Sequence, residues 1–261
     1  MIKIRQWANE KEGVFLTSYL KKMGIPNSSL QHYAKQGKIQ SLGHGAWYFG
    51  KGKPTAYQAV QALQQQTKLP VHVGGITSLI LDGNTHYVYF NHNRIKLFTP
   101  SGISLPLWLS LYHWDFNIEH HKTSFLPIDL GFETYQDDDF FVVKSTKERA
   151  LFETLYQTPD QSNTYECYQN LENWWAVPVD VPLIQKLLDH CNSIKVKRLF
   201  LCFIEDIGFD WVPQLNLKNI YLGKGYCQVE TERCIYEPKY KVSIPLELYQ
   251  TEMNPEMAII W

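Results

Sequence analysis

The sequence predicts an α+β protein in which a winged helix-turn-helix over residues 1–53 precedes a larger mixed α/β domain over residues 54–261. Two segments of helical periodicity, separated by a glycine turn, predict the helix-turn-helix. The sign of the net charge changes after residue 53, which separates this head from the body. Beyond residue 54, β-rich segments alternate with helical ones and predict the mixed domain. Gly50-Lys51-Gly52-Lys53-Pro54 interrupts the regular pattern and marks the boundary.

The chain begins with a segment over residues 2–10 that is predicted to form a short helix. Ile4 and Trp7 would pack this helix against the head, and Gly13 ends it. Val14 and Phe15 are predicted to form a short strand beside the wing.

The first helix of the predicted pair begins near Thr17 or Ser18, either of which is expected to cap it by accepting from its free N–H groups. Gly24 is expected to end it, because glycine adopts positive φ at little steric cost. Pro26 cannot continue a helix with a paired N–H. The apolar face of this helix consists of residues at helical spacing, namely Leu16, Tyr19, Leu20 and Met23.

The second helix is expected to be capped by Asn27 or Ser28 and to end at Gly37. Its inward-facing residues are Leu30, Tyr33 and Ala34. A hairpin, the wing, follows and turns at Gly43-His44-Gly45, because tight turns require φ values that glycine supplies. The apolar positions of this hairpin are Ile39, Leu42, Trp47 and Phe49.

A helix-turn-helix of this kind places its second helix in the major groove of DNA. The alternative is a pair of helices used only for packing. The residues predicted to contact DNA are polar or cationic and come from both helices and the wing: Thr17, Lys21, Lys22, Ser28, Ser29, Gln31, His32, Lys35, Lys38 and His44.

The charge distribution favours the DNA-binding interpretation. Residues 1–53 contain nine Lys or Arg and two Glu, a net charge of +7, whereas the remaining residues contain 16 basic and 24 acidic groups, a net charge of −8. The sum is the −1 of the whole chain. A basic head suits a polyanion because each neutralised phosphate releases counterions.

Composition bounds the class of protein. No apolar run reaches the roughly 18 residues that a membrane span requires, and the start, MIKIRQWANEKEG, lacks the apolar core of a secretory signal. The five cysteines show no C-x-x-C spacing, so free thiols in a reducing cytosol are expected. A contact of Cys227 with Cys234 across a hairpin is the alternative. We therefore expect a cytoplasmic protein.

The body opens with a helix that Thr55 caps and that continues to about Gln66, with Gln64, Gln65 and Gln66 predicted to face solvent. Gly74-Gly75 precede an apolar helix and superficially resemble a phosphate-binding loop, but the full glycine spacing and the following Lys-Ser/Thr are missing. A hairpin is expected over residues 86–98. Residues 103–111 are predicted to lie in the core. Strands are predicted over residues 116–121, 132–135 and 140–143.

Two sets of side chains carry the atoms that bind metal ions. Asp137-Asp138-Asp139 lies between two predicted strands, where a turn exposes carboxylates to water, so a solvated turn is the expected role. The histidines form no helical H-x-x-x-H pair, so structural or surface positions are expected. These histidines are His72, His86, His92, His113, His120 and His121. No metal site and no cofactor is predicted.

The segment STKERALFETLYQ, residues 145–157, predicts a helix that opens with a capping box of Ser145 and Glu148. Within it, Arg149 and Glu153 are four apart and are expected to pair. Asp180 is expected to cap a helix that continues through Cys191.

A further helix is predicted over residues 195–207. Lys195, Lys197 and Arg198 lie at its start, where cations oppose the helix dipole. These three residues are the predicted surface for a partner or a nucleic acid. Strands with turns at Gly223 and Glu237-Pro238 are expected to end the fold over residues 222–245.

The order of these motifs resembles the AbiEi antitoxin family of type IV toxin–antitoxin systems. The resemblance covers roughly residues 14–245 and rests on the winged head and on five segments that follow it in order: LPVHVGGITSLILDG, KSTKERALFETL, SIKVKRLFLCFIEDIG, LGKG and KYKVSIP. By position, the family's wing corresponds to residues 38–48 of this chain. The family wing usually carries an arginine before its last glycine, and His44 stands there in this chain. A neutral histidine holds phosphate more weakly than arginine, so weaker or pH-dependent wing contacts are expected.

The resemblance implies a bacterial transcriptional repressor and antitoxin with no enzymatic activity. Its head would bind inverted repeats in its own promoter, as a homodimer or through cooperative assembly on DNA. Its C-terminal domain would antagonise a nucleotidyltransferase-like toxin encoded beside it, and no membrane association is expected. Two alternatives remain: a metal-dependent nucleic-acid enzyme using Asp115, Glu119 and the 137–139 carboxylates, and an interaction module whose head binds protein or RNA.

Overall fold

The structure is a computed structural model that describes residues 4, 11–83, 93–160, 162–229 and 233–248. The chain forms two compact units. Unit 1 consists of Met1–Val73, Tyr89–Thr123 and Glu133–Lys144, and unit 2 consists of Gly74–Val88, Ser124–Phe132 and Ser145–Trp261. Each unit is therefore assembled from three segments that are separated in the sequence.

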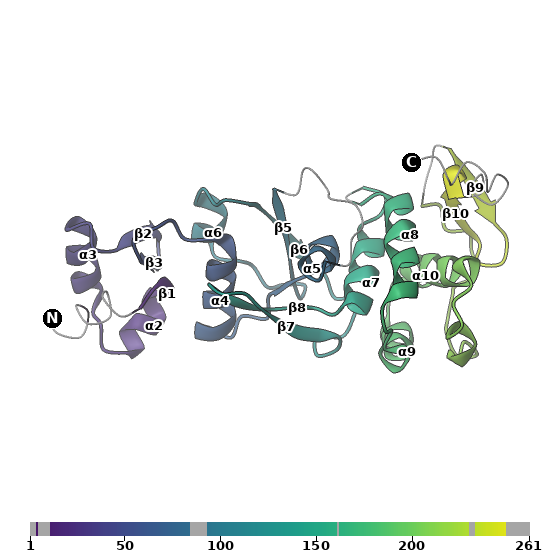
Figure 1. The fold of residues 1–261 in the computed structure, drawn as a ribbon, viewed down its shortest axis with the longest axis horizontal. Helices are drawn as coiled ribbons and strands as arrows, with labels where there is room; N and C mark the ends of the chain where they lie inside the picture. Colours follow the sequence, from purple (N-terminus) through teal and green to yellow (C-terminus); the bar gives the residue numbers. More distant parts are fainter. Residues whose placement is uncertain (1–3, 5–10, 84–92, 161, 230–232, 249–261) are drawn as a thin grey trace. The chain divides into compact units, whose positions relative to one another are not determined.

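Unit 1 begins with a three-stranded antiparallel sheet and two helices (Figure 1). The strands are β1 (Gly13–Leu16), β2 (Gln40–Gly43) and β3 (Ala46–Phe49), and β3 lies between the other two. Between β1 and β2 the chain forms α2 (Thr17–Lys22) and α3 (Asn27–Lys35). These elements confirm the predicted order of strand, two helices and hairpin. Trp7 lies outside the described residues.

The rest of unit 1 is built on a five-stranded sheet in the order β6-β5-β4-β8-β7. Its strands are β4 (His72–Val73), β5 (Arg94–Thr99), β6 (Asn117–Lys122), β7 (Phe132–Gln136) and β8 (Phe141–Ser145). β5 pairs antiparallel with β4 and parallel with β6. The strands predicted near residues 116, 132 and 140 are confirmed, whereas residues 86–92 of the predicted hairpin lie outside the described residues. Two helices, α4 (Ala56–Gln66) and α6 (Leu107–Leu111), complete the unit.

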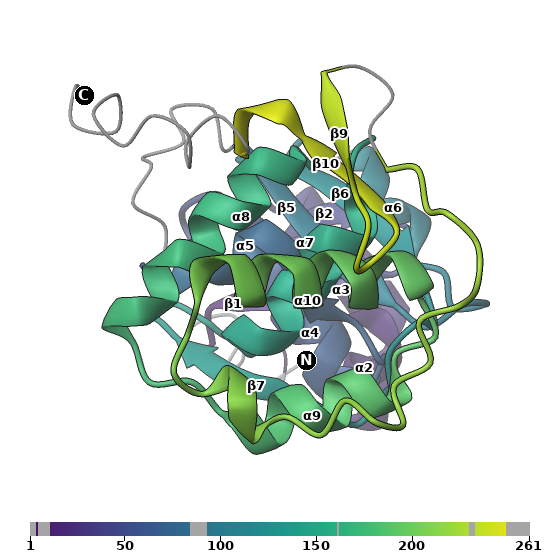
Figure 2. The ribbon, with the colours of Figure 1, turned by 90° about the vertical axis from the view of Figure 1, so that its right-hand side faces the viewer.

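Unit 2 is mainly helical. It contains α5 (Gly75–Leu81), α7 (Lys147–Gln157), α8 (Thr164–Glu172), α9 (Val181–His190) and α10 (Ile194–Ile207), with short 3-10 turns at Asn173–Ala176 and Val212–Gln214. A final antiparallel hairpin pairs β9 (Cys234–Glu237) with β10 (Val242–Pro245). Figure 2 shows β9 and β10 above α10, and α10 contacts α7, α8 and β10.

The core of unit 2 surrounds α7 and α10. Leu151 and Leu155 of α7 and Leu199 and Phe203 of α10 are almost completely buried in one apolar cluster. The rings of Phe152 and Phe200 join the two helices, with centroids 4.7 Å apart. Two amphipathic patterns in the sequence therefore meet face to face.

Several predicted helix caps are confirmed. Thr55 forms a reciprocal capping box with Gln58 at the start of α4, and Asp180 accepts from Leu183 N at the start of α9. The capping box predicted for Ser145 and Glu148 is wrong, because Ser145 is the last residue of β8 and Thr146 caps α7. Ser145 belongs to the strand, so the helix begins later than the sequence pattern predicts.

The architecture is the predicted mixture of helices and strands. Within the part of the chain that the structure describes, no helix has the length and apolar character needed to cross a membrane. All five cysteines are free, so Cys227 and Cys234 do not form a disulfide.

Candidate nucleic-acid interface

The turn between α2 and α3 has a geometry that glycine makes possible. Gly24 has φ +80°, Gly24 N donates to Lys21 O, and Ile25 N donates to Leu20 O, both over 3.0 Å. These two bonds form a Schellman motif, which satisfies the last carbonyls of the helix. Ile25 is buried beneath the turn. The predicted end of the first helix at Gly24 is confirmed.

α3 ends with the same motif. Gly37 has φ +69°, its N–H donates to Ala34 O over 2.9 Å, and Lys38 N donates to Tyr33 O over 3.0 Å. Glycine therefore ends both helices at the predicted positions, and local hydrogen bonds satisfy the last carbonyls of each helix.

The hairpin is tied to the start of α2 by two contacts. Thr17 N donates to Gly45 O over 2.9 Å, and Trp47 Nε1 donates to Thr17 Oγ1 over 2.8 Å. Thr17 is thus the first residue of α2 and an acceptor for an indole. Its predicted role as a side-chain cap is wrong, as is that of Ser18, because Leu16 occupies the cap position and makes no side-chain hydrogen bond there.

The start of α3 also differs from prediction. Pro26 occupies the N-cap position, α3 begins at Asn27, and no side chain caps the helix. The predicted caps Asn27 and Ser28 are therefore helical residues. Because α3 carries no acidic residue in its first turn, its N-terminus combines an uncapped backbone with the positive end of the helix dipole.

The side of α3 opposite its buried Leu30 and Tyr33 is polar. Ser28, Gln31, His32 and Lys35 are exposed there, and Ser29 is partly buried. Gln36 Nε2 lies 2.8 Å from His32 Nε2. Because the glutamine amide donates, His32 Nε2 accepts and its proton lies on Nδ1, which leaves His32 as a hydrogen-bond donor toward a ligand.

Positive charge surrounds this polar side. Lys21 and Lys22 at the end of α2 are exposed, as are Lys35, Lys38 and the hairpin residue His44. The ammonium of Lys38 lies over the Tyr33 ring, 5.1 Å from its centre, which is a cation–π distance, and the Lys38 side chain remains exposed.

Residues 11–49 contain five lysines and one carboxylate, that of Glu12. Glu12 Oε1 accepts from the Tyr48 hydroxyl over 3.1 Å. Burial raises the pKa of the Tyr48 phenol, and its bond to Glu12 raises it further, so the phenol stays protonated and keeps donating. The head is therefore strongly cationic, and its one acid among these residues points at a tyrosine.

The glutamines of α4 have a role that the sequence did not predict. Gln66 Oε1 accepts from Leu16 N over 2.8 Å, and its Nε2 donates to Val14 O over 2.9 Å, so one amide pairs with β1 like a neighbouring strand. Gln64 makes the same pair of bonds with Val143 of β8, each 2.9 Å long. The prediction that Gln64 and Gln66 only face solvent is wrong. The sequence feature that goes with this role is a pair of glutamines, Gln64 and Gln66, two residues apart in one helix.

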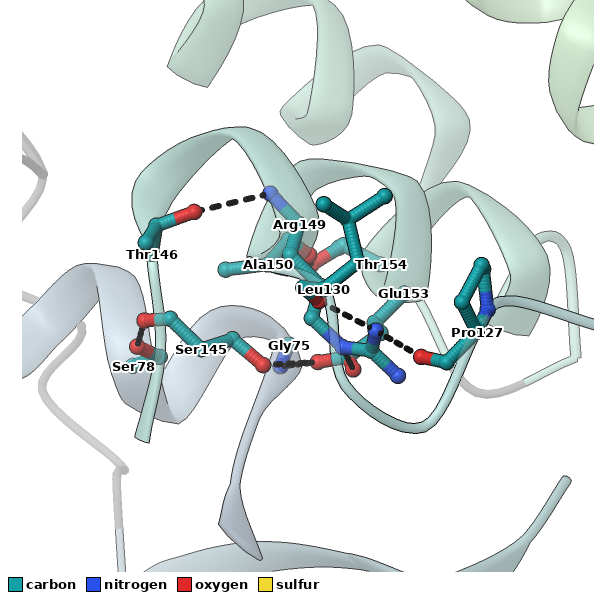
Figure 3. Close-up of polar contacts among 10 residues, drawn as sticks. All are labelled: Gly75, Ser78, Pro127, Leu130, Ser145, Thr146, Arg149, Ala150, Glu153 and Thr154. Atoms are coloured by element: carbon teal, nitrogen blue, oxygen red, sulfur yellow. Dashed lines mark hydrogen bonds and ion pairs between the residues drawn. The ribbon is translucent and has the colours of Figure 1, made fainter. Parts of the chain in front are cut away.

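Another polar cluster lies in unit 2, where Glu153 is completely buried (Figure 3). Its carboxylate accepts from Gly75 N over 2.9 Å, from Ser145 Oγ over 2.7 Å and from Arg149 Nε over 2.8 Å. The predicted pairing of Arg149 with Glu153 is confirmed. The Glu153 carboxylate lies at the N-terminus of α5, where it accepts from Gly75 N. A phosphate bound at Gly74-Gly75 would need this same position.

The guanidinium of Arg149 is held from its other side by backbone oxygens. Its Nη1 donates to Pro127 O and Leu130 O, each over 2.7 Å, and the guanidinium lies 4.3 Å from the centre of the Phe132 ring. The buried charge pair is therefore hydrogen-bonded on both sides by groups within unit 2, which indicates a structural cluster.

The carboxylates considered as metal ligands do not converge. Asp115 accepts from Ala56 N over 3.2 Å, and Glu119 pairs with Arg94 over 2.6 Å. Asp137 to Asp139 are exposed beside a turn in which Asp137 N donates to Phe140 O. Within the described residues, no group of His, Cys, Asp or Glu has the arrangement that a metal ion requires.

The cations at the start of α10 are used inside unit 2. Arg198 is 2% exposed and donates from Nε to Leu222 O and from Nη1 to Lys241 O, over 2.7 and 2.9 Å. Lys195 donates to Tyr156 O over 2.8 Å and also to Thr158 O. Lys197 is buried as well. Lys197 and Arg198 therefore do not present the exposed charge that the predicted partner surface requires, because these side chains bind or pack within their own unit.

Two family models match the chain. Residues 2–90 match one described as the N-terminal domain of AbiEi antitoxin transcriptional regulators, and residues 92–245 match one described as transcriptional regulator, AbiEi antitoxin, type IV toxin–antitoxin system. No curated protein matches the chain. Among solved structures, the crystal structure of the RV2827C protein from Mycobacterium tuberculosis is similar, with a TM-score of 0.63 at 13% identity over 96% of this chain and 93% of that one. At this identity the likeness concerns the fold.

Proposed function

This chain belongs to the AbiEi family of antitoxin transcriptional regulators of type IV toxin–antitoxin systems, and we propose that its residues 13–49 form a winged helix-turn-helix that binds double-stranded DNA. The observation that carries the proposal is the exposed polar side of α3, which begins with an uncapped helix N-terminus and lies among exposed lysines. An α-helix fits the major groove, and a hairpin beside it reaches the adjoining backbone.

The phosphate contacts come from the cations and from the start of α3. Lys21, Lys22, Lys35 and Lys38 supply charge, and the first N–H groups of α3 supply directed donors. His44 at the tip of the hairpin is a further phosphate contact, which strengthens when its ring is protonated. These contacts position the head without distinguishing sequences.

The base contacts come from the middle of α3. Gln31 has both a donor and an acceptor and suits adenine, which presents the complementary pair in the major groove. His32, with its proton on Nδ1, donates to the N7 or O6 acceptors of purines. Ser28 and Ser29 have hydroxyls that serve either base type. Thr17 is engaged by Trp47, so it supports the wing and is not a base contact.

One such head makes few base contacts, so specific binding requires two heads on an inverted repeat. We propose that the protein represses its own operon in this way, as a dimer or through cooperative assembly on DNA. We assign its second role, antagonism of a nucleotidyltransferase-like toxin, to the C-terminal part of the chain, residues 54–261. Both roles are binding functions without catalysis or a cofactor.

The test is a titration of the protein onto its own promoter fragment and onto unrelated DNA of equal length, at several salt concentrations. The unaltered protein should bind the promoter selectively. Lys35→Ala with Lys38→Ala should weaken binding to both fragments and lower the slope of log affinity against log salt by about two, because two phosphate contacts are lost. Gln31→Ala should instead reduce the preference for the promoter.

Lys218→Ala with Lys224→Ala is the matched control, since it removes the same charge from exposed positions in unit 2. If the control pair changes the salt slope as much as the Lys35 and Lys38 substitutions do, DNA is held by general charge attraction and the proposed interface is refuted.

A further inference from the structure

One buried arginine of unit 2 has no carboxylate partner. Arg198 is 2% exposed, and its guanidinium donates only to two backbone oxygens, those of Leu222 and Lys241. Arg149 has the same kind of backbone bonds but also the carboxylate of Glu153. Within the described residues, no ion pair compensates the charge of Arg198. A buried charge without a counter-charge is unfavourable, so this position favours an anion.

One donor of this guanidinium is available to such an anion. Nε and Nη1 of Arg198 make the two backbone bonds, whereas Nη2 makes none in the described parts of the chain and is not sealed from solvent. Nη2 lies beside the loop of residues 221–226, at 3.4 Å from the position that a Cβ on Gly223 would occupy. Gly223 has φ +72° and no side chain, so the loop passes close to Nη2 and leaves it open.

A second cation lies against the same loop. Lys241 is exposed, and its Nζ donates to Lys224 O over 3.5 Å. Two carboxylates of the adjoining α10 and β9 are engaged elsewhere, because Glu205 pairs with Lys239 and Glu237 accepts from two backbone N–H groups of the β9–β10 turn. A phosphate group has the charge and the acceptor oxygens that this pair of cations requires.

Exposed tyrosines begin and end the 221–226 loop. Tyr221 and Tyr226 are 64% and 53% exposed. The ring of Tyr226 meets that of Tyr236 in β9 edge to face, with centroids 5.3 Å apart, and Tyr236 is itself 50% exposed. Proteins hold single-stranded nucleic acids with this combination, since bases stack on aromatic rings while cations bind the phosphates.

We propose that the 221–226 loop binds single-stranded RNA, with a phosphate at Arg198 Nη2 and Lys241 and an unpaired base stacked on Tyr226. RNA is the nucleic acid that fits, because its loops and single-stranded segments present unstacked bases, whereas duplex DNA keeps its bases inside the helix. The inference is independent of the proposed function, because it requires neither the DNA contacts of α3 nor a toxin.

The experiment is a titration of the full chain onto a fluorescently labelled RNA of about 12 nucleotides, composed of alternating cytidine and adenosine and followed by anisotropy. Tyr226→Leu should weaken RNA binding about tenfold, because one stacked base loses its platform. Tyr226→Phe keeps the ring and should restore the affinity. Both variants should bind the promoter duplex as the unaltered protein does, which separates this site from the proposed DNA interface.

A second variant tests the phosphate contact. Lys241→Gln should weaken RNA binding and lower the slope of log affinity against log salt by about 0.7, the value for one phosphate contact on a single strand. Lys186→Gln is the matched control, because it removes an exposed lysine charge on α9, on the other side of α10 from β9 and β10 (Figure 2). It should change neither quantity. Arg198 is left intact because it also holds the loop.

The proposal is overturned if the RNA does not bind at submillimolar protein, or if Tyr226→Phe weakens binding as much as Tyr226→Leu does. It is also overturned if Lys186→Gln lowers the salt slope as much as Lys241→Gln, since the attraction would then be a property of the whole surface. Tighter binding of the deoxyribonucleotide of the same sequence would refute the assignment to RNA.

Discussion

Substitution of Glu153 by glutamine tests whether the buried cluster in Figure 3 supports unit 2. Glu153→Gln preserves the shape of the side chain but removes its charge and converts one acceptor oxygen into a donor. The carboxylate now accepts three bonds, from Gly75 N, Ser145 Oγ and Arg149 Nε. In either orientation, the new amide N–H₂ faces another donor.

The expected loss of stability follows from the group that Glu153→Gln leaves without its ionic partner, the Arg149 guanidinium. Arg149 and Glu153 are 5% and 0% exposed, so the guanidinium loses its counter-charge away from water. Removing one partner of a buried ion pair typically costs about 3–5 kcal/mol. The bonds of Arg149 to Pro127 O and Leu130 O remain, which favours the lower end of that range. For a protein of this size, such a loss lowers the melting temperature by about 10 °C.

The assay is thermal unfolding followed by circular dichroism, combined with amide hydrogen exchange. Exchange should accelerate in α5 and α7, which the carboxylate joins, while β1 to β3 keep their protection. Asp210→Asn is the matched control, because it removes a carboxylate charge at an exposed position of unit 2. It should leave both measurements nearly unchanged.

A second substitution separates the ion pair from the other bonds. Arg149→Met combined with Glu153→Gln should destabilise by less than the sum of the two single variants, because the unpaired charge is gone. Additive losses, or a melting temperature of Glu153→Gln within about 1 °C of the unaltered protein, would refute the assignment of a stabilising buried pair.

Three further outcomes are expected. Gln66→Leu removes both bonds to β1 and should cost about 2 kcal/mol in unfolding free energy, measured by urea denaturation, with faster exchange at the Leu16 amide. Arg198→Met leaves two backbone oxygens without a donor and should accelerate tryptic cleavage after Lys224, while a stable loop would contradict the bracing role of the arginine. Burial raises the pKa of the Cys191 thiol to about 11, so its reactive thiolate is scarce at mildly basic pH. Iodoacetamide should therefore modify the partly exposed Cys227 first, and mass spectrometry of early time points decides the order.

Local rules predicted the path of the head. Gly24 and Gly37 end the two helices, and the turn between β2 and β3 falls at the predicted glycines with φ +123° at Gly43 and +101° at Gly45. Each of these features depends on backbone conformation and hydrogen bonds within about five residues. Such interactions involve residues that are neighbours in the sequence, so they can be predicted without knowledge of the tertiary structure.

Side-chain partners were predicted less well. Thr17 was expected to cap α2 and instead accepts from Trp47, 30 residues away. Gln64 was expected to face solvent and instead pairs with Val143, 79 residues away. Arg198 was expected on a partner surface and is instead bonded to two backbone oxygens. In each case a distant group competes with water or with the local backbone, and the distant group prevails.

By itself, the sequence determined the order of elements, the ends of the helices in the head, the charge contrast between head and body, and the pairing of Arg149 with Glu153. Only the tertiary structure decided which polar groups are available to a ligand. The reason is physical: helix ends and turns are selected by local steric and hydrogen-bond preferences, whereas a side chain's partner depends on which distant backbone groups folding leaves unpaired nearby. The polar side of α3 is of this second kind.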